Sequence, residues 1–455
     1  MNFELSNFEL SNTLTLDLPS QFKPQSVLTH QDFIVTPIWF LILLGLAYFI
    51  RPMVTTPETR KYFLPGLLVK FFGAIAIGLI YQFYYSWGDT FTFFSESRRL
   101  WTILEDEPIS FFRILFQSPE ELNDLIHLTS RIWSFRSPSN FVMVRILSLV
   151  NLLTFKTYGA SALIYATFSF SGSWAFYTAL YKRYNNPHWS IAACILFIPS
   201  VVVWGSGIFK DTLTFGGLMW LSWAIVSLGD LRGTWLVKVA VGTLASWLIL
   251  RVKSYILVSF LPLAVLYIVL VKYRKISSRF LKIIFVPFFL VIGLGGAYYS
   301  LLEAGEYDAK YSIENIALTA QVTAYDIAYG AGQGGSTYNL GKLDGTLIGM
   351  IKLVPKAIAV SLFRPFLWEI SNPLMFLSAV ESTFMLFVAF RAISKRSVLS
   401  RLAADPFILF CLIFTLLFAS AVGLSSYNFG TLSRYKIPML PFFGLFLALL
   451  SKREK

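Results

Sequence analysis

The stretch Trp87-Gly88-Asp89-Thr90 ends an apolar run and begins a polar one. Asp89 is therefore predicted to be a carboxylate at a membrane–water boundary, where it could act as a general base or hold a metal ion. Its simpler alternative role is to cap the helix that follows. Glu96 lies seven residues further on, which is about two helical turns, so both acids would share one face if this stretch is helical.

Two further charged groups lie where apolar runs meet. Lys210 and Asp211 form a tight turn, where ionisable residues are costly and often functional, although a mutual ion pair with helix capping by Asp211 is an equal alternative. Arg251 and Lys253 interrupt a nearly continuous apolar stretch from 234 to 271. They could bind phosphate, for which a guanidinium is well suited, or could only extend to lipid headgroups.

Two more groups combine charge with other binding features. The stretch Arg364-Pro365-Phe366-Leu367-Trp368-Glu369 places an arginine and an acid beside two aromatic rings, although such rings also form interfacial belts. The last predicted outer loop contains Asn428, Arg434 and Lys436 around a glycine, and a loop of this kind could wrap an anion. Together these groups offer one carboxylate for proton chemistry and several cations for a phosphate. A substrate that is part lipid and part phosphate fits this layout.

The elements that must position these groups are membrane spans. The 455-residue chain is 56% hydrophobic and 14% charged, with a mean hydropathy of +0.64, whereas soluble domains carry about 25% charged residues. The apolar residues come in runs of roughly 17–25, each long enough to cross a membrane, so we predict an all-α, polytopic transmembrane helical bundle. The net charge of +13 is expected to face anionic lipids rather than nucleic acid. The cysteines and histidines show no metal-site spacing, so a zinc or haem enzyme is not expected.

We count about eleven spans, within a range of about ten to thirteen. They cover about 33–50, 65–87, 159–181, 188–208, 211–228, 234–250, 255–271, 281–299, 373–390, 405–424 and 437–450. Lys and Arg concentrate in every second loop, which places the N-terminus outside and the C-terminus in the cytoplasm. The segments 141–156 and 346–364 are short or charged, so we expect them to lie at the outer interface or to enter it partway.

The spans divide the chain into a polar N-terminal tail, residues 1–32, and a single transmembrane domain, residues 33–455. Two long outer loops are predicted at 88–158 and 300–372. The first contains apolar segments separated by prolines, which are typical of short helices lying on a membrane. The second contains the glycine-rich stretch 330–335, which lacks the spacing of a phosphate-binding P-loop and could be a mobile flap or a plain loop.

Three motifs in the predicted outer loops resemble the GT-C superfamily of polytopic glycosyltransferases, which use polyprenyl-phosphate sugars as donors. They are Gly88-Asp89 at the start of a large first outer loop, Pro199-x-x-x-x-Trp204-Gly205-Ser206-x-x-x-Lys210-Asp211 in a turn between spans, and Arg434-Tyr435-Lys436-x-Pro438 before the last span. Bacterial O-antigen and exopolysaccharide polymerases are similar in parts of this pattern.

The resemblance implies catalytic roles for Asp89 and Asp211. Asp89 corresponds to an acid that acts as base on the acceptor hydroxyl or holds a divalent cation such as Mg or Mn, and Arg434 corresponds to a residue near the lipid phosphate. Many members of the family carry paired acids in this loop, whereas Thr90 follows Asp89 here. The other substrate-binding candidates are Glu96, Lys210, Arg251, Lys253, Arg364, Glu369, Asn428 and Lys436.

The implied function is that of an inverting glycosyltransferase in a bacterial inner membrane. It would move a sugar from a polyprenyl-phosphate donor to an acceptor glycan, lipid or protein on the periplasmic side. One alternative is a polymerase or ligase of lipid-diphosphate-linked oligosaccharides, which would depend more on the basic residues than on Asp89. Another is a transporter or flippase for a lipid-linked or anionic substrate, which would have charges near the bilayer midplane, broken helices and internal repeats.

Overall fold

The computed structural model describes residues 27–184, 188–228, 234–275, 318–322, 325, 336–341, 344–394 and 398–451. Within these ranges the chain is helical and forms no β-strand, apart from an isolated antiparallel bridge between Thr337 and Asn428. The predicted all-α class is therefore confirmed. Most of the predicted N-terminal tail lies outside the described residues, and the first helix of the described part begins at His30.

Several helices are long and apolar enough to cross a membrane. Among the described residues there are five, with a sixth span if two helices bent by 113° are taken as one. The five are α1 (His30–Val54), α2 (Arg60–Ile80) with its continuation η3 (Tyr81–Tyr85), α11 (Trp235–Lys275), α15 (Pro373–Ile393) and α17 (Pro406–Ser426), and the bent pair is α6 (Pro138–Thr154) with α7 (Tyr158–Tyr184). These helices establish a membrane protein whose apolar surface contacts lipid.

The predicted count of eleven spans is not confirmed. The predicted span 188–208 is broken into α8 (His188–Leu196) and α9 (Pro199–Trp204), because the residue before a proline is pushed out of the helical conformation. The last predicted span contains only the 12-residue helix α19 (Leu440–Ser451), which at 1.5 Å per residue is about 18 Å long and too short to cross ~30 Å of hydrocarbon. The predicted span 281–299 lies outside the described residues.

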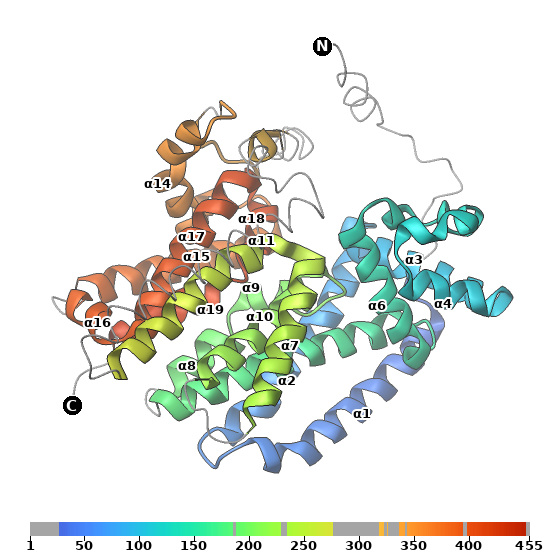
Figure 1. Ribbon diagram of the computed structural model, residues 1–455, viewed down its shortest axis with the longest axis horizontal. Coiled ribbons are helices and arrows are strands. Elements are labelled where there is room, and N and C mark those ends of the chain that lie inside the picture. The colour runs from blue at the N-terminus through green and yellow to red at the C-terminus, as the bar shows by residue number, and fades with distance from the viewer. Residues whose placement is uncertain are drawn as a thin grey trace.

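Helix α11 contains both of the spans predicted between 234 and 271. It leaves helical geometry at Lys253, where φ is −148° and ψ is 78°, and Figure 1 shows its yellow-green ribbon as two arms that meet near the α11 label. Ile249 on the first arm packs near Gly217 of α10 (Lys210–Ser227). Phe260 on the second arm contacts the rings of Phe410 and Phe414 in α17.

The first long loop folds into short helices, as its proline pattern predicted. They are α3 (Asp89–Asp106), α4 (Pro108–Phe116), η4 (Pro119–Leu125), α5 (Ile126–Thr129) and η5 (Trp133–Arg136), followed by α6. Helices α4, η4 and α6 each begin with a proline in the first turn, where its missing N–H costs nothing. The segment 346–364 also forms a helix, α14 (Leu347–Phe363). Whether these helices lie at the outer interface stays a prediction.

The helices form one connected apolar core. Figure 1 shows the teal helices α3, α4 and α6 on one side, the orange-to-red helices α14 to α17 on the other, and α9 and α10 between them. α10 packs against α7 and α11, and α17 packs against α11, α14 and α19. Among the spans that the structure describes, helix α1 is the most exposed. Its apolar side chains such as Phe33 and Phe49 are over two-thirds exposed, which fits a lipid-facing surface.

Candidate functional site

Asp89 is positioned by an irregular end of α2. The π-helical turn η3 is followed by Ser86 in the left-handed region and by Gly88 at φ +156°. A Cβ atom on Gly88 would lie 2.2 Å from a ring carbon of Tyr81, so only glycine fits here. Gly88 is the N-cap residue of α3, and the carboxylate of the next residue, Asp89, accepts a hydrogen bond from Nη1 of Arg434 at 2.8 Å. The side chain of Asp89 is 58% exposed.

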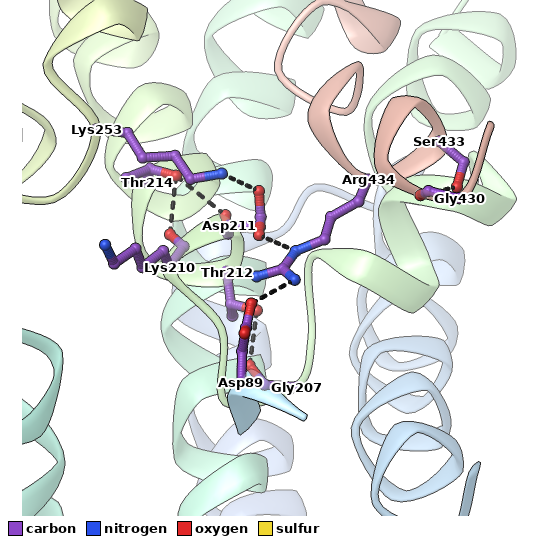
Figure 2. A network of polar contacts seen from close by, with 10 residues as sticks. All are labelled: Asp89, Gly207, Lys210, Asp211, Thr212, Thr214, Lys253, Gly430, Ser433 and Arg434. Atoms are coloured by element: carbon purple, nitrogen blue, oxygen red, sulfur yellow. Dashed lines mark hydrogen bonds and ion pairs between the residues drawn. The ribbon is translucent and has the colours of Figure 1, made fainter. Parts of the chain in front are cut away.

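Asp211 lies in the first turn of α10 and is buried, with its side chain only 2% exposed. One carboxylate oxygen accepts from Nζ of Lys253 at 2.6 Å, and the other accepts from Nε of Arg434 at 2.5 Å. Figure 2 shows Lys253 and Arg434 reaching Asp211 from opposite sides, with Asp89 beyond Arg434. Asp89, Asp211, Lys253 and Arg434 form what we call the four-charge network. It joins residues up to 345 positions apart in the chain.

Aromatic rings hold the two cations of the network in place. The guanidinium of Arg434, which belongs to α18 (Phe429–Tyr435), lies 4.5 Å from the ring centre of Phe209. Nζ of Lys253 lies 4.5 Å from the ring centre of Tyr435. Burial opposes the charge on Arg434, but the carboxylates of Asp211 and Asp89 hold the pKa of its guanidinium well above its usual range. With two acids and two bases, the network is electrically neutral.

Asp89 and Arg434 line a cavity of about 360 Å³. Lys253 and Asp211 lie behind Arg434 and do not line it. The other lining residues combine aromatic rings, amides and hydroxyls, and they are Tyr81, Tyr85, Trp204, Asn372, Leu374, Met375, Asn428, Gly430, Thr431, Ser433 and Tyr435. Rings and hydrogen-bonding groups around a carboxylate and a guanidinium suit a polar ligand that carries an anionic group.

A larger cavity of about 660 Å³ lies between α1, α2, α7 and α10. Its walls are mostly apolar, and polar lining residues such as Thr56 and Lys182 lie near helix ends away from Asp89. It contains none of the candidate residues. Its apolar walls suit a lipid chain better than a reaction, so the smaller cavity is the candidate site.

Part of the second long loop lies beside this site. Thr337 forms its bridge with Asn428, and the backbone N–H of Phe429 donates to the carbonyl of Ser336 at 2.8 Å. The Asn428 side chain also caps α18 by accepting from the N–H groups of Gly430 and Thr431. The predicted glycine-rich stretch 330–335 lies outside the described residues.

The remaining candidates lie outside the four-charge network. Glu96 is on α3 with Asp89, as predicted, but it is buried and both of its oxygens accept from the backbone N–H of Ser134 at 3.2 and 3.3 Å. This burial raises the pKa of Glu96, and the hydrogen bonds to Ser134 only partly offset it. The seven-residue spacing therefore correctly predicted that Glu96 shares a helix with Asp89. The side chain of Glu96, however, points into the protein.

Four other candidates also point elsewhere. Lys210 donates to the hydroxyl of Ser139 at 2.9 Å rather than pairing with Asp211, and Arg251 is exposed. Arg364 and Glu369 form an ion pair with each other, and hydrogen bonds from Arg364 and from the Phe366 N–H hold the pKa of Glu369 below its usual value despite partial burial. The guanidinium of Arg364 lies 5.0 Å from the ring centre of Phe429, so this pair supports α18 from outside the network.

Lys436 belongs to a second buried polar group, together with Glu381 and Ser382. Nζ of Lys436 donates to the Ser382 hydroxyl at 2.9 Å. Glu381, in the middle of α15, accepts from the backbone N–H of Ser200 at the start of α9 at 2.7 Å. Its other carboxylate oxygen is buried and makes no hydrogen bond with the residues that the structure describes. The charge of Lys436 lies near Glu381, but among the described residues no ion pair within 4 Å joins the two side chains.

Lys70 was not singled out from the sequence. It lies in the middle of α2 and is 1% exposed. Its Nζ donates to the carbonyls of Val201 and Gly205, at 3.0 and 2.9 Å, and to the Ser169 hydroxyl at 3.1 Å. Lys70 thereby anchors the C-terminal end of α9 and the turn that leads to Asp211. A lysine within an apolar run was the available signal.

The donor set does not match a divalent-cation site. Each carboxylate of the four-charge network is bound to a cationic side chain, and among the described residues no three His, Cys, Asp or Glu side chains come together as ligands. The residues at Asp89 therefore do not fit the Mg or Mn ion that the resemblance suggested, and we derive no step through a metal.

Comparison of the chain with protein-family models, with curated proteins and with solved structures finds no match. The function must therefore be argued from the geometry of the site.

Proposed function

We propose that this protein is an inverting glycosyltransferase of the bacterial inner membrane. It would move a sugar from a polyprenyl-phosphate donor to an acceptor glycan, lipid or protein on the periplasmic side. The observation that carries the proposal is the pairing of Asp89 with Arg434 on one cavity wall. This places a water-accessible carboxylate within reach of the group suited to bind a phosphate.

The reaction needs a base and an anion stabiliser, which these two residues supply. The acceptor hydroxyl oxygen attacks the anomeric carbon of the sugar while the bond from that carbon to the phosphate oxygen breaks. The hydroxyl proton passes to Asp89, and the phosphate leaves with the bonding electron pair. Arg434 stabilises the charge that develops on the phosphate.

Asp211 and Lys253 have positioning roles in this proposal. Asp211 is buried and already accepts from two cations, so it has no free oxygen with which to take a proton from a substrate. It holds Nε of Arg434 and leaves the terminal nitrogens of the guanidinium on the side of Asp89, as Figure 2 shows. Asn428 lines the cavity and caps the helix that carries Arg434. The bases Arg251 and Lys436 lie away from this cavity and are not proposed to bind the phosphate.

The experiment uses purified protein in lipid with a radiolabelled polyprenyl-phosphate sugar pool. Asp89→Asn is compared with Asp106→Asn, which removes the same charge from an exposed position at the other end of α3. Transfer by the wild type and by Asp106→Asn, together with a loss of at least about 100-fold in Asp89→Asn, would support the base. Equal transfer by all three proteins would refute it.

A transporter or flippase is the second candidate, because the structure contains two features expected of one. The helix pair α8–α9 is broken, and Lys70 and Glu381 are buried in the middle of 21-residue helices at the two ends of α9. Charges at the ends of broken helices are typical of transport sites. Movement of a fluorescent lipid phosphate across the membrane of proteoliposomes, lost in Glu381→Gln but kept in Asp89→Asn, would favour transport over sugar transfer.

A polymerase, the other alternative, would retain activity in Asp89→Asn and lose it in Arg434→Lys.

A further inference from the structure

We propose that the phosphate group of the ligand binds Arg434 by replacing the carboxylate of Asp89. Arg434 holds Asp89 in the structure, and Asp89 would be released when the headgroup binds. This inference deepens the proposed function and rests on it for the identity of the lipid. The group that the site recognises is a phosphate, which could belong to a lipid headgroup or be free inorganic phosphate.

The two carboxylates on Arg434 differ in how firmly they are held. Asp211 is 2% exposed, accepts from Nε of Arg434, and is fixed from its other side by Lys253. Asp89 is 58% exposed, and its contact to this guanidinium is the single bond from Nη1. Water competes with an exposed ion pair and makes it weak. Asp89 is therefore the exchangeable partner, and Asp211 is the fixed one.

The guanidinium still has capacity for an incoming anion. Its Nη1 is bound to Asp89, and its Nη2 makes no hydrogen bond with the described residues. Figure 2 shows the terminal nitrogens of Arg434 on the side of Asp89, and both residues line the cavity. An oxyanion can accept from both nitrogens of such a planar fork. A phosphate that took both would displace the Asp89 carboxylate, which it also repels.

The charge balance of the site also favours replacement of Asp89 by a phosphate. The four-charge network is neutral while Asp89 is bound to Arg434, so it then has no net positive charge to attract an anion. If Asp89 moves away, Asp211, Lys253 and Arg434 leave a net charge of +1 at the wall of the cavity. Binding of one phosphate oxyanion then restores neutrality around Arg434.

The exchange couples binding to chemistry. While Asp89 is held by Arg434, its carboxylate is engaged in the hydrogen bond from Nη1. Once the phosphate takes its place, Asp89 is free at the cavity wall and can accept the proton of an acceptor hydroxyl. The base would then be available only while the phosphate-bearing ligand is present.

The test is a binding measurement on the full-length protein in nanodiscs. Inorganic phosphate and a short-chain prenyl phosphate are titrated calorimetrically into the wild type, Asp89→Asn and the matched charge control Asp106→Asn. Removal of the competing carboxylate should tighten phosphate binding about five- to tenfold in Asp89→Asn, while Asp106→Asn should bind like the wild type. Arg434→Lys, which keeps the charge beside Asp211 but lacks the fork, should lose the gain when combined with Asp89→Asn.

The outcomes separate the sources of the ligand and the two proposals. Tighter binding of both probes in Asp89→Asn would mean that the site recognises the phosphate alone, and tighter binding of the prenyl phosphate only would assign the site to a lipid headgroup. Unchanged or weaker binding of both probes, or an equal gain in Asp106→Asn, would overturn the exchange. If binding tightens as expected but the wild type transfers no sugar, the anion site stands and the glycosyltransferase function falls.

Discussion

Asp211→Asn is predicted to destabilise the protein far more than Asp89→Asn, although both carboxylates bind the same guanidinium. Asp211 is 2% exposed and contacts Lys253 and Arg434 at 2.6 and 2.5 Å. Its replacement removes the charge that compensates two largely buried cations, and breaking a buried ion pair by removing one partner costs about 3–5 kcal/mol. Asp89 is 58% exposed, and an exposed ion pair contributes only about 0–1 kcal/mol.

The assay is equilibrium unfolding of the purified protein in mixed micelles, followed by the loss of helical circular dichroism. The wild type, Asp211→Asn and Asp89→Asn are compared, and Asp106→Asn again controls for the loss of one negative charge. Adding Lys253→Met to Asp211→Asn should recover part of the lost free energy of unfolding, because the second change removes a cation left without its partner. A loss in Asp211→Asn no larger than that in Asp106→Asn would refute the buried role of Asp211.

Three further changes test the elements around the site. Lys70→Met should cost about 1–3 kcal/mol of unfolding free energy, because it leaves two buried carbonyls without their donor, and it should lower sugar transfer, whereas Lys61→Met on the exposed face of α2 should do neither. Burial raises the pKa of Glu96, so the folded protein binds a proton on this carboxyl more tightly than the unfolded chain does. The folded protein should therefore lose stability as the pH rises through the raised pKa. Unfolding midpoints measured between pH 4.5 and 8 should show this loss in the wild type but not in Glu96→Gln. Gly88→Ala should reduce transfer about tenfold or more by displacing Asp89, whereas Gly45→Ala, which has open space around it, should have no effect.

The convergence of distant charges was the part of the site that the sequence could predict. Asp89, Asp211, Lys253 and Arg434 each end or interrupt an apolar run, and the sequence therefore predicted that they share one site. Which acid meets which base could not be predicted, because it depends on how the helices tilt and where α11 bends at Lys253. Lys210 shows this limit, since it is adjacent to Asp211 in the chain but donates to Ser139.

The number of spans was harder to predict, because hydropathy shows only how long an apolar segment is. It does not show whether the segment faces lipid or packs against other helices. Helices α8, α9 and α19 are apolar because they pack inside the protein, and they are too short to cross the membrane alone. Pro199 was a readable signal for the break between α8 and α9. Glu96 was misread as a ligand-facing acid for a related reason: its partner, the backbone of Ser134, lies 38 residues away, and no local pattern reveals that contact.

The central claim is that a lipid-linked phosphate sugar reacts in the cavity bounded by Asp89 and Arg434. Photo-cross-linking with a polyprenyl-phosphate sugar that carries a diazirine next to the phosphate, followed by peptide mass spectrometry, tests it most directly. We predict labels on cavity residues such as Tyr85, Met375 and Thr431, with competition by unlabelled donor. Labels confined to the apolar cavity between α1 and α7, or labels insensitive to competitor, would contradict the claim.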